Sequence, residues 1–148
     1  MRIKIATYVP LSPDKVLSGF NQSLFLELAP PFPKVKVLRF DGCEKGDIVE
    51  IQLLLPIWPQ LWRSHITDNG ALPNGGHFFV DAAEGSDLPF FLGKWKHEHL
   101  MEADGTGTKI IDQINYEGRY SWLTPLLWPV LWMQFYLRKP IYQRIFNA

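Results

Sequence analysis

Two histidines and an aspartate in the second half of the chain are the residues best suited to chemistry. His97 and His99 stand in a run that alternates apolar with charged residues, and Asp112 stands in the next such run. Side chains of a β-strand alternate between its two faces, so both histidines share one face. If the two runs pair as a hairpin across the glycine-containing turn 104–107, Asp112 falls close to the histidines. The sequence therefore predicts a buried polar cluster.

Such a cluster can serve three kinds of chemistry. Two histidines and one carboxylate are metal ligands by type, but they fall short of the closed four-ligand set of a structural site, and we predict no metal. An aspartate beside a histidine can support general acid or base catalysis, because the carboxylate raises the imidazole pKa and holds one tautomer. A hydrogen-bonded network that satisfies buried polar groups and orients a ligand is the simplest interpretation.

Alternating segments supply the strands that must hold this cluster. The expected strands are residues 3–7, 35–37, 49–55, 58–67, 77–82, 91–101 and 109–116. Turns are expected at 41–47, at Asp68-Asn69-Gly70 and at 104–107, where glycine, asparagine and aspartate gather. Connections this short cannot make parallel crossovers, so the sheet should be an antiparallel meander.

Two short helices should follow the first strand, and a longer one should end the chain. Ser12-Pro13-Asp14 places a hydroxyl, a proline and a carboxylate where the start of a helix favours them. Asn21 can cap a second helix that ends near Leu28, before the proline-rich segment 30–33. In 123–146 the apolar residues recur at a spacing of three and four, which predicts the long helix.

The long helix is more apolar than a surface helix needs to be. Trp122, Trp128 and Trp132 extend its apolar surface beyond one stripe, so we expect it to be buried on most sides. Pro140 should kink or divide it. A sheet with one apolar face needs a cover, and this helix is the long element available for that purpose. A curved sheet around it can leave a pocket between the two surfaces.

Length, charge and cysteine content narrow the class of protein. The 148 residues fit one domain, 1–148, and fifteen basic against fifteen acidic residues give no footprint for a nucleic acid partner. Cys43 is the only cysteine, so no intramolecular disulfide can form and a cytoplasmic location is expected. The alternating start of the chain does not look like a signal peptide. Residues 120–137 carry no charge, but Pro125 and Pro129 disfavour a membrane-spanning helix.

The most specific segment runs from Pro89 to His99, where a Pro-Phe pair precedes a Trp-x-His-x-His strand. A Gly-rich turn and a Thr-x-x-x-Asp-x-x-x-Tyr strand follow, ending at Tyr116. These motifs, and the order of elements along essentially the whole chain, resemble a bacterial branch of the SRPBCC superfamily, also called START-like, Bet v 1-like or helix-grip proteins. The resemblance implies an α+β fold with a curved antiparallel sheet of six to seven strands wrapped around a long C-terminal helix. Proteins of that branch are usually described as ligand-binding or cyclase/dehydratase-like.

Binding of a small hydrophobic ligand in a cavity between sheet and helix is therefore the predicted function, with a lipid, an isoprenoid or a polyketide-like molecule as the ligand class. The predicted polar end consists of His97, His99 and Asp112, and no cofactor is expected. The predicted apolar walls are formed by Trp95, Met101, Ile110, Ile114, Leu127, Leu131 and Phe135.

Two further functions stay open. One is a cyclase or dehydratase that uses His97, His99 and Asp112 as acid or base on a carbonyl-bearing substrate. The other is a peripheral membrane or protein-interaction module that docks through the tryptophan-rich start of the last helix. The sequence carries no signal for the oligomeric state.

Overall fold

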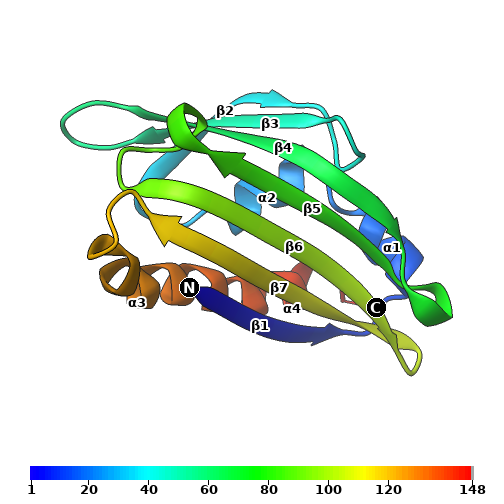
Figure 1. The fold of residues 1–148 in the computed structure, drawn as a ribbon. Helices are drawn as coiled ribbons and strands as arrows, with labels where there is room; N and C mark the ends of the chain where they lie inside the picture. The colour runs from blue at the N-terminus through cyan, green and yellow to red at the C-terminus, as the bar shows by residue number, and fades with distance from the viewer. Residues whose placement is uncertain (148) are drawn as a thin grey trace.

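Seven strands form one curved antiparallel sheet in the computed structural model, which describes residues 1–147 (Figure 1). The sheet order is β1-β7-β6-β5-β4-β3-β2, so consecutive strands are neighbours and β1 joins the meander beside β7. The strands are β1 (Arg2–Val9), β2 (Lys34–Phe40), β3 (Ile48–Leu54), β4 (Gln60–Ala71), β5 (His77–Glu84), β6 (Leu92–Asp104) and β7 (Gly107–Gly118). The predicted meander is confirmed.

Four α-helices accompany the sheet in the described part of the chain. They are α1 (Pro13–Ser18), α2 (Gln22–Leu28), α3 (Leu123–Tyr136) and α4 (Arg138–Ile145). Asn21 caps α2 as predicted, because its Oδ1 accepts a hydrogen bond from the Leu24 N–H at 2.9 Å. Figure 1 shows α3 and α4 running along the β1 and β7 side of the sheet, with α1 and α2 behind it. None of the helices within residues 1–147 combines the length and the apolarity needed to cross a bilayer.

The predicted C-terminal helix is divided at Leu137, ahead of Pro140. Pro140 has no N–H to donate to the Tyr136 carbonyl, and its ring crowds that carbonyl. The regular hydrogen bonding of α3 therefore stops at Tyr136. Pro140 itself lies in the first turn of α4, where a helix does not need that N–H. Arg138, the first residue of α4, directly follows this break.

The expectation that the last helix is buried on most sides is wrong. In α3 only Leu131 and Phe135 are buried. The sheet covers one side of the helix, and no other described element packs on the outer side. The outer side therefore exposes the large apolar side chains of Leu126, Met133 and Tyr136, preceded by Trp122. An apolar sequence indicates what a helix could bury, but burial also requires a partner.

The expected turn at Asp68-Asn69-Gly70 is also wrong, because β4 continues through it to Ala71. A β-bulge between Ile66 and Asp68 shifts the register there, and the chain reverses later, at Pro73–Gly75. The Asn69 side chain accepts a hydrogen bond from the Lys45 N–H at 2.9 Å, so this polar segment ties the β2–β3 connection to β4.

The buried apolar residues form two groups along the sheet. One group surrounds Trp95 and α3, and the other surrounds Tyr142 of α4 together with α1 and α2. His97, His99 and Asp112 are buried polar residues of β6 and β7. The sheet therefore presents polar groups to the interior, on the side that the helices cover.

Candidate functional site

A cavity of about 310 Å³ lies between the sheet and helices α2 and α3. Side chains from α2, β3, β4, β6 and α3 form its apolar walls. Among them are Leu24, Phe25, Leu28, Val49, Ile51, Leu53, Trp62, Trp95, Leu127, Leu131 and Phe135. Asp81, His97, His99 and Arg138 also line it and give the cavity one charged side.

Six of the ten residues predicted for the site line this cavity. They are Trp95, His97, His99, Leu127, Leu131 and Phe135. The other four, Met101, Ile110, Asp112 and Ile114, are buried but are not on the cavity wall. Met101 and Ile110 pack in the group around Tyr142, and Ile114 packs in the group around Trp95. They share the inward face of the sheet with the lining residues, but there the space is filled by packed side chains.

The opposite wall of the cavity comes from residues that the site prediction left out. Val49, Ile51 and Leu53 point inward from β3, and Leu24 and Leu28 reach the cavity from α2. Their signal in the sequence is the alternation of 49–55 and the helical spacing after Asn21. Neither pattern tells which other element will lie across from it.

The predicted proximity of the histidines and Asp112 is present in the structure. His99 lies directly opposite Asp112 in the β6–β7 register, and His97 Nε2 is 2.8 Å from Asp112 Oδ1. The centroids of the two imidazole rings are 3.6 Å apart, and the ring planes are tilted by 31°. Because Asp112 is 2% exposed, this contact is shielded from water.

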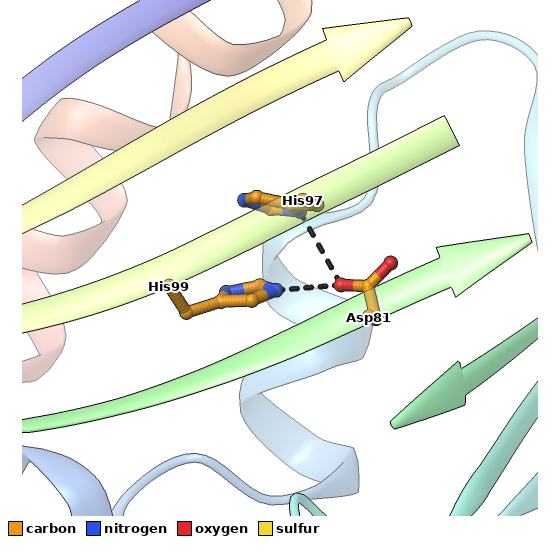
Figure 2. A group of neighbouring side chains, drawn as sticks. All are labelled: Asp81, His97 and His99. Carbon is orange, nitrogen blue, oxygen red and sulfur yellow. Dashed lines mark hydrogen bonds and ion pairs between the residues drawn. The ribbon is translucent and has the colours of Figure 1, made fainter. Parts of the chain in front are cut away.

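Asp81 of β5 is the member of the cluster that sequence analysis missed. It lies opposite His97 in the β5–β6 register. Its Oδ2 is 2.7 Å from His99 Nε2 and 3.5 Å from His97 Nδ1 (Figure 2). Its Oδ1 accepts a hydrogen bond from Trp95 Nε1 at 3.2 Å. The available signal was a single aspartate inside the apolar strand 77–82.

Arg138 and Tyr142 bring α4 to the same cluster. Arg138 Nη1 is 3.6 Å from Asp112 Oδ1, and the guanidinium lies 4.3 Å from the centre of the Phe135 ring. Tyr142 donates a hydrogen bond to Asp112 Oδ1 at 3.4 Å. Asp112 thus interacts with groups from β6 and α4 at once. Asp81, His97, His99, Asp112 and Arg138 are called the polar cluster below.

The surroundings of the carboxylates favour their ionised forms. Burial alone raises the pKa of Asp112, but the hydrogen bond from His97, the charge of Arg138 and the two histidines outweigh it, and the pKa falls to about 2. Burial likewise opposes ionisation of Asp81, yet its pKa is lowered, chiefly by the hydrogen bond from His99. Burial, followed by the charge of His97, lowers the pKa of His99 to about 4. Near neutral pH both carboxylates are therefore ionised and His99 is neutral.

The two other histidines lie outside the cavity, and the single cysteine is unreactive. His65 pairs with Asp87 at 3.1 Å and His77 with Asp14 at 2.6 Å, and neither histidine lines the cavity. Cys43 does line the cavity, but burial raises the pKa of its thiol to about 12, with the charges of Asp81 and Asp47 adding to the shift. It is therefore a thiol, not a thiolate nucleophile.

The tryptophans divide between the cavity and the surface. Trp62 and Trp95 line the cavity and meet edge to face, with ring centroids 4.8 Å apart. Trp58 and Trp122 are exposed. Trp128 and Trp132 stack on each other on α3, outside the cavity. Only two of the six tryptophans can therefore contact a bound ligand.

Comparison with known proteins gives matches by structure only. No protein-family model and no curated protein sequence matches the chain. A structure of norcoclaurine synthase from Thalictrum flavum is 15% identical, with a TM-score of 0.57 over 88% of this chain and 82% of the other. A protein from Thermus thermophilus is 15% identical, with a TM-score of 0.56 over 91% and 86% of the two chains. The Zhui aromatase/cyclase of Streptomyces is 17% identical, with a TM-score of 0.51 over 81% and 69%.

These similarities, together with the seven-stranded sheet and the C-terminal helices, show that the chain has the Bet v 1-like helix-grip fold. The fold that the resemblance to the SRPBCC superfamily implies is confirmed. At these identities the similarity says nothing about a shared ligand or reaction, so the function has to be argued from the cavity and its polar cluster.

Proposed function

We propose that the protein binds a small hydrophobic molecule in the cavity between the sheet and helices α2 and α3. The observation that carries the proposal is a cavity of about 310 Å³ with apolar walls and one charged side. Ligand pockets typically combine such walls with a few polar groups that fix orientation, and their volumes begin at about 300 Å³. A compact lipid, isoprenoid or polyketide-like molecule fits this description.

Arg138 is the group in the cavity best suited to receive a polar end of the ligand. Its guanidinium lines the cavity and is 3.6 Å from Asp112 Oδ1, which is longer than a direct hydrogen bond. Guanidinium N–H groups can donate to a carbonyl, a carboxylate or a hydroxyl oxygen. We expect the oxygen-bearing end of the ligand to lie beside Arg138 and its apolar part to lie along β3 and α3.

Ligand binding is tested by extracting the purified protein for mass spectrometry and by titrating it with a fluorescent apolar probe. Ile51→Trp introduces a bulky indole ring on the cavity wall. Gln52→Trp introduces the same indole ring at a neighbouring residue of β3 that does not line the cavity. The first variant should lose probe binding and the second should keep it. No co-purified molecule together with no probe uptake by the wild type would count against the proposal.

Acid or base catalysis is a second candidate, and the position of His97 favours it. His97 Nε2 is 2.8 Å from Asp112 Oδ1, whereas His97 Nδ1 is 3.5 Å from Asp81 Oδ2, which is longer than a direct hydrogen bond, and His97 lines the cavity. Asp112 holds the imidazole, and Nδ1 can then exchange a proton with a bound carbonyl compound. His97→Asn and His99→Asn should abolish turnover of such a substrate but spare its binding. Unchanged turnover in both variants would remove this candidate.

We further propose that one end of the molecule contacts a lipid bilayer while the ligand is exchanged. The strand registers place four segments at this end of the sheet. They are the start of β2, the β3–β4 connection, the β5–β6 connection and the entry to α3. Its exposed large apolar residues, called the apolar end below, are Phe32, Ile57, Trp58, Phe90, Tyr120 and Trp122. Leu126 and Val130 continue this surface along α3, and Val130 also lines the cavity.

Aromatic residues of this kind favour the interface between membrane and water, and a hydrophobic ligand is most soluble in the bilayer itself. Ile57 is 81% exposed and Trp58 is 60% exposed, so both can insert without any rearrangement of the core. Co-sedimentation with phosphatidylcholine vesicles tests the contact, with Ile57→Ser/Trp58→Ser as the variant. A wild-type protein that stays in the supernatant, or that forms dimers through this end, would contradict membrane contact.

A further inference from the structure

The polar cluster has the donor atoms of a metal site once Asp81 is included. Asp81, His97 and His99 each offer one ligand atom, and these atoms lie within 4.8 Å of one another. Figure 2 shows the Asp81 carboxylate beside both imidazole rings, with contacts to each. We propose that Asp81, His97 and His99 bind a divalent first-row transition metal ion, such as Zn²⁺ or Fe²⁺, on the wall of the cavity.

The spacing of the ligand atoms suits a single ion. Asp81 Oδ2 is 3.5 Å from His97 Nδ1 and 2.7 Å from His99 Nε2. Nitrogen and oxygen ligands bound to one tetrahedral ion at about 2.1 Å lie about 3.4 Å apart. The first distance already fits, and the second lengthens when the ion replaces the hydrogen bond between His99 and Asp81. All three residues line the cavity, so the remaining coordination positions face the space for a ligand.

An unpaired nitrogen of His99 supplies an independent observation. Its Nδ1 is the one buried side-chain nitrogen or oxygen without a hydrogen-bond partner among the described residues. Because His99 Nε2 donates to the ionised Asp81, Nδ1 carries a lone pair, and the nearest carboxylate oxygen, Asp112 Oδ1, is 3.9 Å away. A metal ion on Nε2 moves the imidazole proton to Nδ1. The unfavourable approach of two acceptors then becomes an attraction between an N–H group and a carboxylate.

Asp112 has the position of a supporting carboxylate behind the metal ligands. Its Oδ1 accepts the Nε2–H of His97 at 2.8 Å, which leaves the Nδ1 lone pair of His97 toward Asp81. Metal-bound histidines commonly donate their other N–H to a carboxylate in this way, and the contact fixes the tautomer and the ring orientation. Two histidine nitrogens and one carboxylate also favour a transition metal over Ca²⁺ or Mg²⁺, which prefer oxygen ligands.

The charge balance of the polar cluster favours a cation as well. The two carboxylates of Asp81 and Asp112 face one guanidinium, that of Arg138, so these three groups together carry one uncompensated negative charge. An uncompensated charge in a buried site is costly. A bound ion of charge +2 reverses the sign of the site and would hold an anionic or carbonyl end of a ligand at the open positions. The alternative to a metal ion at this site is a proton held between the carboxylate oxygens and the imidazole nitrogens.

The proposal is tested with the wild-type protein after chelation and dialysis, with Co²⁺ as the spectroscopic probe. We expect one Co²⁺ per chain, visible absorption bands from nitrogen and oxygen ligands, displacement by Zn²⁺ and no displacement by Mg²⁺. Asp81→Asn should abolish the bands, and Asp112→Asn should weaken Co²⁺ binding about 10- to 100-fold, as is typical of supporting carboxylates. His65→Asn is the matched control, because His65 also pairs with an aspartate but lies outside the cavity.

Histidine ¹⁵N spectra of the wild type keep the test independent of how well the buried variants fold. Zn²⁺ should move the proton of His99 from Nε2 to Nδ1 and leave the resonances of His65 unchanged. The proposal is overturned if Zn²⁺ does not change the His99 tautomer, if Co²⁺ binding is not saturable at one per chain, or if His65→Asn removes binding and Asp81→Asn does not. Metal binding and apolar probe uptake are separate measurements, so either proposal can fail while the other stands.

Discussion

Asp112 in the polar cluster and Leu126 on the outer side of α3 illustrate two opposite kinds of environment in this molecule. Asp112 is 2% exposed and interacts with His97, Arg138 and Tyr142, each of which would lose a buried partner without it. Leu126 is 62% exposed and does not line the cavity. A substitution in the polar cluster should therefore lower the free energy of unfolding strongly, because several residues lose a partner. A substitution on the outer side of α3 should change the free energy of unfolding little, and its effect is expected on binding.

The largest effect is expected for Asp112→Ala. Removing one partner of a buried charged network leaves the others uncompensated and typically costs about 3 to 5 kcal/mol. We expect a loss of this size in the free energy of unfolding, measured by urea titration. Asp112→Asn keeps the shape and two hydrogen-bonding groups and should lose less. Equal stability of Asp112→Ala and wild type would show that the polar cluster is not a coupled network.

A matched pair within α3 tests the comparison on apolar residues. Phe135 is buried against Trp95 and His97, whereas Met133 lies on the exposed side. Phe135→Ala should lower the free energy of unfolding by about 3 kcal/mol or more, and Met133→Ala should change it by less than about 0.5 kcal/mol. Thermal and urea unfolding of both variants provide the measurement. Similar losses in the free energy of unfolding for the two variants would mean that the outer side of α3 is covered in solution.

Acidification should weaken the polar cluster and leave the outer face untouched. His99 has its folded-state pKa lowered to about 4 from an unfolded value of 6.5, so the unfolded chain takes up its proton first as the pH falls. The stability from neutral His99 is complete above pH 6.5 and is lost between pH 6.5 and about 4. The slope reaches about 1 kcal/mol per pH unit, and the total is on the order of 3 kcal/mol.

Chelator-treated protein should show this slope in urea titrations at several pH values, and His99→Phe should flatten it. Below about pH 4 protonation of Asp112 continues the loss in both proteins, because its pKa in the folded state is about 2. A wild-type stability that is constant between pH 6.5 and 4 would mean that water reaches His99 in solution.

The smallest effect on folding is expected at the exposed apolar surface. Val130→Ser and Leu126→Ser remove exposed side chains and should change the free energy of unfolding by less than about 0.5 kcal/mol. The same variants should reduce co-sedimentation with vesicles, since Leu126 and Val130 extend the apolar end along α3. Reduced stability without reduced vesicle binding would show that this surface stabilises the fold and does not contact the membrane.

Much of the fold follows from local patterns in the sequence. The period of two in 91–101 and 109–116 placed His97, His99 and Asp112 on the inward face, and the short turn between the strands brought them together. Asn21 and the proline-rich segment marked the ends of α2 correctly. Each of these features depends on residues a few positions apart, so a single sequence contains the information.

Other features depend on elements far apart in the chain. Asp81 joins the polar cluster because β5 pairs with β6, and Arg138 joins it because α3 and α4 pack against β1 and β7. Asp81 is marked locally only as a single aspartate in an apolar strand, and neither residue carries a local signal for the elements that lie beside it.

The sequence by itself determined which residues face inward, where most strands and helices lie, and that the chain forms a single antiparallel meander with helices at its side. The tertiary structure alone decided where the interior is hollow. Met101 and Ile110 face the same side as His99, but they meet packed side chains of the helices, whereas Val49, Ile51 and Trp95 border open space. Periodicity specifies the direction of a side chain, and the distance to the opposite wall depends on how separate elements pack.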